Sequence, residues 1–312
     1  MLARRYRQMV GRYALLLTAG MALQLLWGDV DASFLSYPWS LVVAMNYMYI
    51  LILLYTKSDS VKSLRRLYDR PATLTSLASM LVLTLLFGLI RQDGTTEGVW
   101  GMLGFTRMSS SWIFVLFLLH FMTVIGLKAV EDVHRWKQRK LPAVMMHVSL
   151  FIILASAVLG SGEKVRVKVM TALDAPVHIG ITEDRKMYEL PFTLTLNEFI
   201  VEEYPPQVYV IDGEERIMPQ REVKKYLSRV SIIDEDGTRD VEILVNHPAR
   251  IGAWRIYQSG YDSSRGKQST ISILECVKDT WYPMIHIAMW MILLGGVMMF
   301  AVGLKKNKED RT

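Results

Sequence analysis

Residues 141–162 read LPAVMMHVSLFIILASAVLGSG, and this stretch decides how the rest of the chain is organised. It is long enough to cross a bilayer, and it has no acidic or basic residue before Glu163. Its one titratable side chain is His147, which lies among Met, Val, Leu, Phe and Ile. Apolar runs precede the stretch, whereas the residues after it, up to Lys278, have the composition of a soluble domain. It therefore marks the predicted boundary between a membrane part and a soluble domain.

The overall composition is typical of a membrane protein. Of the 312 residues 51% are hydrophobic, which leaves room for one soluble domain of ordinary size. The net charge of +6 alone would fit nucleic-acid binding, but the Lys and Arg residues cluster beside the apolar runs. We therefore expect a lipid bilayer and no nucleic acid as a partner. With Cys276 as the single cysteine, the chain has no internal disulfide, no CxxC pair and no CxxCH haem-attachment motif.

Six apolar runs predict six transmembrane helices, each near the ~20 residues that a bilayer requires. The predicted spans are residues 10–28, 39–56, 73–90, 111–127, 142–160 and 281–304. The last five contain no Asp, Glu, Lys or Arg. The first run resembles a signal peptide. However, Asp29 and Asp31 lie where a cleavage site is expected, which favours an uncleaved transmembrane span. The predicted organisation is a membrane domain (1–160), a soluble domain (161–280), the sixth helix and a tail (305–312).

The distribution of positive charge predicts the orientation of these spans. Eighteen Lys and Arg residues lie on one side, in residues 1–13, 57–72, 128–141 and 305–312. The short loops of the other side contain Arg91 and Arg107 only. By the positive-inside rule both termini are cytoplasmic and the soluble domain is outside. For a bacterium with two membranes, this predicts an inner-membrane protein with a periplasmic domain.

The soluble domain has the pattern of a β structure. The predicted strands are short and rich in β-branched and aromatic residues, and they cover residues 164–170, 193–196, 208–211, 227–233, 241–245, 254–257 and 270–274. Turn signals separate them, namely Asp212-Gly213, Asp236-Gly237, Asn246-His247-Pro248 and Ser259-Gly260. The charged residues 214–226 are predicted to form a loop or short helix. The predicted fold class is therefore a polytopic α-helical membrane protein, with a mainly-β extracytoplasmic domain inserted between helices 5 and 6.

Histidines are the candidate ligands. His134 in a basic loop, and His178 and His247 in the β domain, are interpreted as surface residues, whereas His120, His147 and His286 lie in predicted spans. His147 is five residues inside its span, or ~8 Å deep at 1.5 Å per residue. A histidine at such a depth is costly, which favours a function, although a helix–helix hydrogen bond is an equal alternative. Neutral imidazole ligates iron, and histidines without an intramembrane acid fit haem better than proton pumping.

Several segments of the soluble domain carry a resemblance to a known family. The matching residues are Pro191-Phe192, Phe199, Tyr204-Pro205, Tyr226, Ser228, Val230, Val245-Asn246-His247-Pro248, Gly252, Tyr257-Gln258 and Tyr261. In this order they resemble the ResB-like (CcsB-type) cytochrome c biogenesis family of system II, and the His147 span resembles the family's span before its outer domain. The chain lacks the tryptophan-rich haem-handling segment of the partner subunit, which indicates the unfused short form.

The resemblance implies a subunit of the membrane complex that moves haem to the outer face and supports its covalent attachment to apocytochrome c. It implies that an intramembrane histidine pairs with one from a CcsA-type haem-handling partner to hold haem transiently. Only His147 matches that position, as an axial ligand of the haem iron. His120 is a second candidate on chemistry alone. The chain is then a non-catalytic subunit of a holocytochrome c synthase complex, since haem attachment belongs mainly to the partner.

Two other functions remain open. One is a structural scaffold whose β domain docks envelope proteins without binding haem. The other is a transporter or sensor, which the lack of intramembrane acids disfavours. Within the β domain, Trp254, Tyr257 and Tyr261 are expected to be buried anchors of the core rather than haem contacts. No role follows from the sequence for Cys276 or for His286.

Overall fold

The computed structural model describes residues 2–138, 140–183, 185–204, 207–211, 214–218 and 223–309. The chain divides into two compact units. The first, here called the helical unit, comprises Met1–Glu163 and Trp281–Thr312. The second, here called the β domain, comprises Lys164–Thr280. Each unit has its own hydrophobic core and is described by itself.

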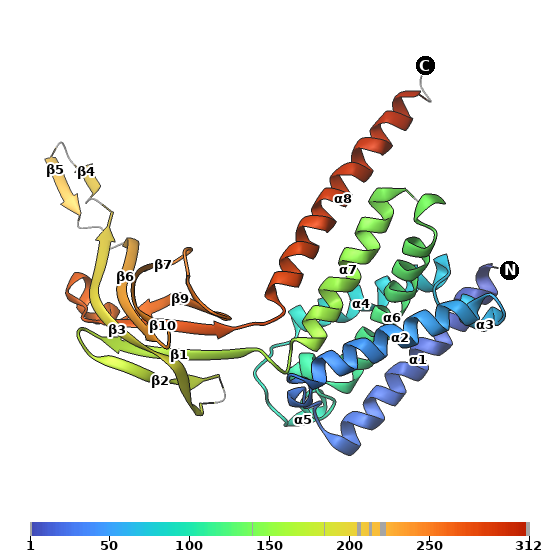
Figure 1. The fold of residues 1–312 in the computed structure, drawn as a ribbon, viewed down its shortest axis with the longest axis horizontal. Coiled ribbons are helices and arrows are strands. Elements are labelled where there is room, and N and C mark those ends of the chain that lie inside the picture. The colour runs from blue at the N-terminus through green and yellow to red at the C-terminus, as the bar shows by residue number, and fades with distance from the viewer. Residues whose placement is uncertain are drawn as a thin grey trace. The chain divides into compact units, whose positions relative to one another are not determined.

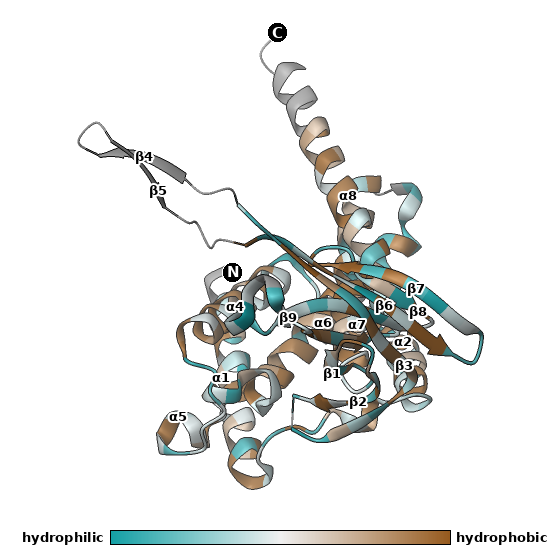
Figure 2. Ribbon diagram, turned by 90° about the vertical axis from the view of Figure 1, so that its left-hand side faces the viewer, coloured by the Kyte–Doolittle hydropathy of each residue, from teal (hydrophilic) through white to brown (hydrophobic). Residues whose placement is uncertain are grey.

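Among the described residues, six helices are long and apolar enough to cross a membrane. They are α1 (Leu2–Trp27), α2 (Trp39–Ser58), α4 (Arg70–Leu89), α6 (Trp112–His134), α7 (Leu141–Leu159) and α8 (Tyr282–Glu309) (Figure 1). Two short helices, α3 (Lys62–Arg65) and α5 (Gly98–Met102), lie in the connections. Hydrophobic residues, brown in Figure 2, run along the long helices. The predicted helical membrane fold is confirmed.

Helix α6 is the centre of the helical unit. It contacts α1, α2, α4 and α7, and it is the most buried of the six long helices. Small residues permit this close packing: a Cβ added at Gly126 of α6 would lie 2.7 Å from Leu51 Cδ1 and 2.8 Å from Phe151 Cε2. Helices in lipid gain stability when small residues let their neighbours approach. Gly126 therefore fixes how closely α7, the helix that carries Phe151, lies against α6.

Over its described residues, the β domain is an antiparallel sheet of eight strands with a separate two-stranded hairpin. The strands of the sheet are β1 (Val165–Ala172), β2 (Pro176–Thr182), β3 (Met187–Glu203), β6 (Val223–Asp234), β7 (Gly237–Leu244), β8 (Ala249–Ile251), β9 (Trp254–Tyr261) and β10 (Ile271–Lys278). Their order is β7-β6-β3-β2-β1-β10-β9-β8, and the two edge strands β7 and β8 also contact each other, so the sheet nearly closes into a barrel. The predicted mainly-β domain between the fifth and sixth membrane helices is confirmed.

Alternating burial along the strands builds one core inside this sheet. Along β1, for example, Val167 and Val169 are buried whereas Arg166 and Lys168 are exposed. Such a period of two is expected when one face of a strand packs inward. The buried residues of β1, β3, β6, β9 and β10 form a single hydrophobic cluster, with Trp254 among its members.

The structure differs from the predicted pattern at several places. Residues 214–218 form strand β5, which pairs with β4 (Gln207–Ile211), and β6 already begins at Val223, so the predicted loop or short helix over 214–226 is wrong. Strands β2 and β8 were also not predicted from the pattern. The expected Asp212-Gly213 turn lies outside the described residues.

The turn expected at Ser259-Gly260 is a bulge. Strand β9 continues to Tyr261, and its pairing with β10 shifts between Gln258, opposite Leu274, and Gly260, opposite Ile273. Ser259 is therefore the extra residue of a β-bulge, at which small residues such as Gly are common. The Asp236-Gly237 turn between β6 and β7 is confirmed, and Gly237 has a φ of +122° there.

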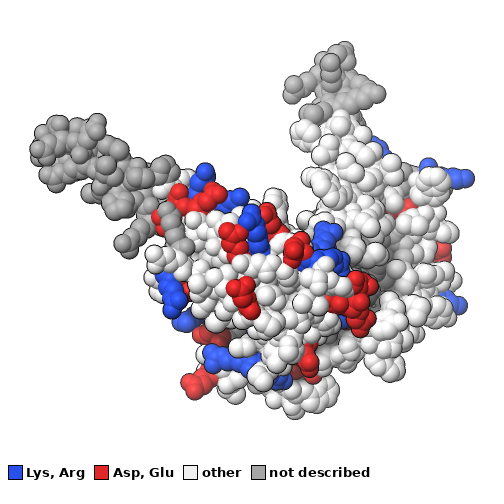
Figure 3. Space-filling model, turned by 60° about the vertical axis from the view of Figure 1, so that its left-hand side comes forward, with Lys and Arg blue, Asp and Glu red and all other residues white. Residues whose placement is uncertain are grey.

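The surface of the β domain carries charges of both signs. Figure 3 shows acidic and basic side chains interspersed on the visible face of this domain. Many of them are paired: Arg229 forms ion pairs with Glu198 and Glu242, and Arg239 with Asp234. The two pairs of Arg229 are exposed on both sides, and surface ion pairs of this kind contribute about 0–1 kcal/mol each. The domain is therefore stabilised mainly by its core.

Candidate functional site

The candidate ligand His147 lies in the second turn of α7. This helix begins at Leu141, with Pro142 in its first turn, where a missing N–H costs no helical hydrogen bond. The imidazole side chain is 29% exposed, so one part of the ring is covered by the protein and another is not. Helix α7 contacts α6, α2 and α8. His147 is thus held on a rigid element in a position that another molecule can reach.

The covered part of the imidazole meets a buried carboxylate. Nδ1 of His147 lies 2.6 Å from Oδ2 of Asp132 on α6, and the Asp132 side chain is only 2% exposed. A short hydrogen bond of this kind, with an ionised acceptor, is stronger than one between neutral groups. The partner of this ring nitrogen is therefore an aspartate side chain of the neighbouring helix.

Asp132 belongs to a longer helix than the sequence pattern indicated. Helix α6 continues past Leu127 to His134 and brings Lys128, Glu131 and Asp132 into the same element. The expectation of intramembrane histidines without a nearby acid is therefore wrong for His147. Hydropathy alone ended the span at Lys128, because a charged residue lowers the average even where its helix continues. The sequence did contain a signal for this contact. Asp132 lies near the end of one helix, and His147 lies near the start of the next.

Adjacent acids on α6 have different partners. Glu131 Oε2 accepts a hydrogen bond from Lys128 Nζ at 2.6 Å, and Glu131 Oε1 lies 3.8 Å from Arg135 Nη1. These partners are three and four residues away, which is one turn of the helix. Asp132 is rotated from Glu131 by about 100° because consecutive residues are so related in a helix, and it contacts α7. The two acids therefore divide between an ion pair within α6 and the imidazole of His147.

The arrangement at His147 leaves one ring nitrogen available to a metal. A neutral imidazole has one N–H donor and one acceptor nitrogen. When Nδ1 donates to the Asp132 carboxylate, Nε2 carries the lone pair. Among the described residues Nε2 forms no hydrogen bond. Histidine ligands of metals are commonly held in this way, with the other nitrogen donating to a carboxylate or carbonyl. The donor set fits one axial ligand of a haem iron.

The second candidate, His120, is in a different environment. It lies on α6, where its Nε2 is 3.4 Å from the Tyr13 hydroxyl of α1 and its ring meets the Tyr13 ring edge-on at 5.5 Å. This contact is of the kind that joins two helices. His286 on α8 lies 3.0 Å from the Tyr282 hydroxyl, one turn away. None of the described contacts brings His120 or His286 to His147.

The remaining histidines are exposed. His134 ends α6 and packs beside the Tyr55 ring, at a centroid distance of 5.6 Å. His178 lies in β2, and His247 lies in the turn between β7 and β8, where its backbone bridges to Leu244. Within the described ranges, no group of three or more His, Cys, Asp or Glu side chains could together hold a metal ion.

The segment around Tyr257 and Gln258 belongs to the core of the β domain on one face only. Trp254 is 6% exposed and packs against Phe192 and Tyr188, with ring centroids 5.8 and 6.0 Å away. Tyr261 is half-buried and packs against the same core. Tyr257, which alternates with these inward positions, is half-buried and is not a member of the core. The expectation that Tyr257 is a buried anchor is therefore wrong, because β9 turns it to the other face.

Gln258 is the centre of a buried polar network. Its Oε1 accepts a hydrogen bond from Ser228 Oγ at 2.6 Å, and its Nε2 donates to Ser272 Oγ at 2.8 Å and to the Gly260 carbonyl at 2.9 Å. Ser228 and Ser272 also share a hydrogen bond of 2.7 Å, and the Thr171 hydroxyl donates to the Ser272 carbonyl. Gln258 uses both ends of its amide here. These polar residues hold β1, β6, β9 and β10 in register inside an otherwise apolar core.

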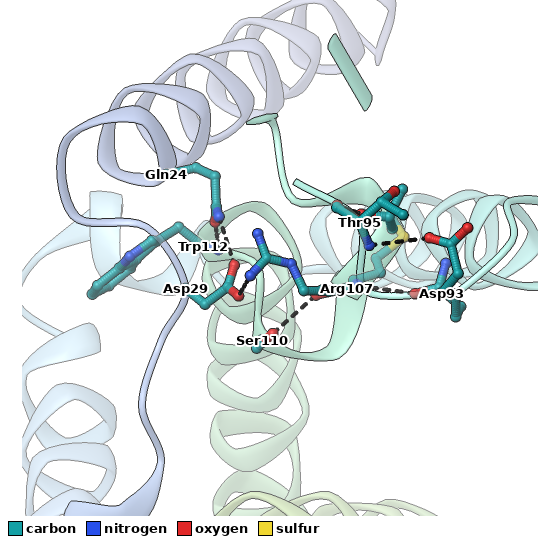
Figure 4. Close-up of polar contacts among 10 residues, drawn as sticks. Gln24, Asp29, Asp93, Thr95, Arg107, Ser110 and Trp112 are labelled. Carbon is teal, nitrogen blue, oxygen red and sulfur yellow. Dashed lines mark hydrogen bonds and ion pairs between the residues drawn. The ribbon is translucent and has the colours of Figure 1, made fainter. Parts of the chain in front are cut away.

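A third polar cluster ties the end of α1 to the start of α6 (Figure 4). Gln24 Nε2 donates to Asp29 Oδ1 at 2.8 Å, and Gln24 Oε1 accepts from the backbone N–H of Trp112 at 3.0 Å. Asp29 in turn forms an ion pair with Arg107. Asp29 and Arg107 therefore help to hold these two helix ends together.

The fold and these sites define a class: a polytopic helical membrane protein with a barrel-like β domain before its last span and a partnered histidine in the span before that domain. Residues 135–286 match the ResB-like family. Over these residues, which include α7 with His147 and the β domain, the chain is similar to the ResB-like family, and the resemblance seen in the sequence is confirmed.

Other comparisons add little to this assignment. No curated protein sequence matches the chain. One solved structure with a partial likeness is described as cytochrome c haem lyase CcmF, at 12% identity and a TM-score of 0.31. The match covers 70% of this chain and 33% of that protein, so this chain spans about a third of its length. A likeness of this extent supports no conclusion about function.

Proposed function

We propose that this chain is a haem-handling subunit of a membrane complex for cytochrome c biogenesis. In this proposal His147 is one axial ligand of haem in transit, and a CcsA-type partner supplies the other. The ResB-like match supports the role in cytochrome c biogenesis. The observation that carries the ligand assignment is the 2.6 Å contact from Asp132 to Nδ1 of His147, because it leaves Nε2 available.

The residues around His147 suit haem as cargo. Haem is a flat, apolar macrocycle, and α7 presents apolar side chains on either side of His147 in the sequence. The chain would bind the iron through Nε2 and keep the imidazole oriented through Asp132. It would not itself form the covalent bonds to apocytochrome c, and it is proposed as a non-catalytic subunit. His120 has a helix–helix contact with Tyr13 and is the weaker candidate.

The proposed topology places haem handling in the bacterial inner membrane with the β domain in the periplasm. Its support is the excess of Lys and Arg in the loops on the side of the two termini. A reporter that is active only in the cytoplasm, fused at Glu235 in the β domain, should be silent. Strong activity there would reverse the orientation and remove the β domain from the compartment where cytochromes c are completed.

The test of the function is cytochrome maturation in cells that depend on this chain. His147→Gly should insert at normal levels, and the yield of haem-stained c-type cytochromes should fall by about tenfold or more, since losing even an outer-shell partner of a ligand typically costs 10–100-fold. Added imidazole should restore part of the yield, because it can occupy the vacated space and bind the iron. His120→Gly is the matched control and should retain most of the yield.

Normal maturation with His147→Gly would contradict the ligand assignment. A loss of chain level in His147→Gly, together with no rescue by imidazole, would indicate that the histidine only packs helices. The scaffold function, in which the β domain docks envelope partners, would then be the better explanation.

A further inference from the structure

We propose that Asp132 is a positioning residue for haem: it holds His147 in the tautomer that presents Nε2 to the iron. This inference rests on the proposed function, because it concerns how the same imidazole is made ready. Asp132 lies outside the segment matched by the ResB-like family, which begins at residue 135, so the match itself assigns it no role. The assignment comes from the contact between α6 and α7.

The first step is the direction of the hydrogen bond. An ionised carboxylate has only acceptor atoms, so a contact of 2.6 Å between Asp132 Oδ2 and His147 Nδ1 requires the proton on Nδ1. The opposite neutral tautomer, with the proton on Nε2, would set two lone pairs against each other at this distance. The tautomer with its proton on Nδ1 is therefore also the one that leaves the lone pair of Nε2 available to the iron.

The second step is orientation. The Asp132 side chain is almost fully buried, with an exposure of 2%. The surrounding side chains therefore prevent it from rotating into solvent. The close packing at Gly126, where α6 meets Phe151 of α7, holds the two helices at the separation that the hydrogen bond needs. Phe151 is one helical turn from His147. Helix α7 is therefore held against α6 at two positions, by the packing at Gly126 and by the hydrogen bond from His147 to Asp132.

The third step is charge. A buried carboxylate without a partner is costly, and the carboxylate of Asp132 has the imidazole of His147 as a hydrogen-bond partner. A carboxylate hydrogen-bonded to Nδ1 also increases the electron density at Nε2, which makes the imidazole a better ligand for iron. Asp132 therefore acts both on the geometry and on the strength of the ligand.

Glu131 provides a matched control. It is adjacent in sequence, it is also buried, and its replacement by Gln removes the same charge from the same turn of α6. It forms ion pairs with Lys128 and Arg135 of its own helix. If Asp132 mattered only as a negative charge near the end of α6, Asp132→Asn and Glu131→Gln would change the His147 tautomer and the retained haem equally.

The first measurement is made on the full-length chain without haem, in lipid nanodiscs, with ¹⁵N-labelled histidine. The His147 resonances are identified by their loss in His147→Gly. Wild type and Glu131→Gln should show a protonated Nδ1 and a bare Nε2, whereas Asp132→Asn should populate the tautomer protonated on Nε2. A wild-type spectrum with the proton on Nε2 overturns the proposal, and this result needs no variant to fold.

The second measurement is haem retained per chain after purification. Asp132→Asn should lose about tenfold or more, in the range known for outer partners of ligands, whereas Glu131→Gln should stay within about twofold of wild type. Because Asp132 acts through His147, the double variant His147→Gly/Asp132→Asn should retain the same haem as His147→Gly alone. Full haem in Asp132→Asn, or a further loss in the double variant, overturns the positioning role.

These outcomes separate the inference from the proposed function. If His147→Gly loses haem while Asp132→Asn keeps both its haem and the wild-type tautomer, only the role of Asp132 fails. If His147→Gly keeps its haem, the proposed function fails first. If Asp132→Asn does not accumulate, Asp132→Glu, which preserves the carboxylate, should restore accumulation and haem together; accumulation without haem would contradict the proposal.

Discussion

The polar cluster at His147 is partly exposed and the polar network at Gln258 is buried, and the two also differ in which polar atoms they leave without a hydrogen bond. In the β domain, the Gln258 amide makes three hydrogen bonds, and the two serines beside it bond to each other as well. At His147, Nδ1 is bonded to Asp132, and among the described residues Nε2 has no hydrogen bond. A network in which every polar group is hydrogen-bonded can only stabilise the fold. A fixed imidazole whose second nitrogen has no hydrogen bond can also bind a ligand.

This difference gives opposite expectations for substitutions in the two regions. Changes in the β-domain core should lower the free energy of unfolding, and through it the level of the chain. Changes at His147 should leave the level intact and remove a ligand. The predictions below test the first half of this contrast, and the final measurement tests the second.

The largest effect on stability is expected at Trp254. Truncation of a buried aromatic residue costs about 3–5 kcal/mol, and Trp254 packs against two other rings inside the β domain. Trp254→Ala should therefore reduce the amount of intact chain in membranes and increase protease cleavage within 164–280. Tyr257→Ala, on the other face of β9, should cost about 1 kcal/mol, within the range of an average substitution. Equal effects of the two substitutions would contradict the observed orientation of β9, in which Trp254 faces the core and Tyr257 faces away from it.

A smaller effect is expected at Gln258. Gln258→Leu removes a hydrogen-bond partner from the Ser228 hydroxyl, the Ser272 hydroxyl and the Gly260 carbonyl, and each buried group left unpaired costs about 1–3 kcal/mol. Part of this is offset by the bond that Ser228 and Ser272 keep, so we expect a loss of about 2 kcal/mol. Ser259→Ala in the adjacent bulge is the control and should change stability by about 0.5 kcal/mol or less. Denaturant unfolding of the full chain in nanodiscs, followed by protease sensitivity, measures both.

The smallest effect concerns Cys276, whose thiol is completely covered in the same core. Burial, with a contribution from Glu275, raises the pKa of the Cys276 thiol from 9.0 to about 12. A thiol maleimide at pH 8 should therefore leave the native chain unmodified and label it only after denaturation. The raised pKa contributes stability that is present up to a pH of about 9 and is lost as the pH rises toward 12. Rapid labelling of the native chain would show that this core opens.

The parts of this molecule that could be predicted from sequence are those fixed by local pattern. Uninterrupted apolar runs marked six spans, and alternation with turn residues marked a β domain between the last two. The β5 strand was missed because its charged residues do not alternate clearly. The bulge at Ser259 was read as a turn because Ser-Gly has the same local preference for both, and only pairing with β10 distinguishes them.

The candidate site was predicted only in part, because half of it depends on contact between helices. His147 stood out as a single ionisable residue in its span. Asp132 did not, since it follows a charged segment that looks like the beginning of a loop. Its role becomes visible when α6 is seen to continue to His134 and to pack against α7. The same holds for Gln258, whose partners Ser228 and Ser272 come from strands 30 and 14 residues away.

The central claim is that His147 supplies a nitrogen ligand to haem through Nε2. The most direct measurement is the absorption spectrum and haem content of the full chain purified with its partner, as wild type, His147→Gly and His120→Gly. The account predicts that His147→Gly accumulates normally, retains about a tenth of the haem or less, and regains a nitrogen-ligated Soret spectrum with added imidazole, whereas His120→Gly resembles wild type. Full haem content and an unchanged Soret band in His147→Gly would contradict it.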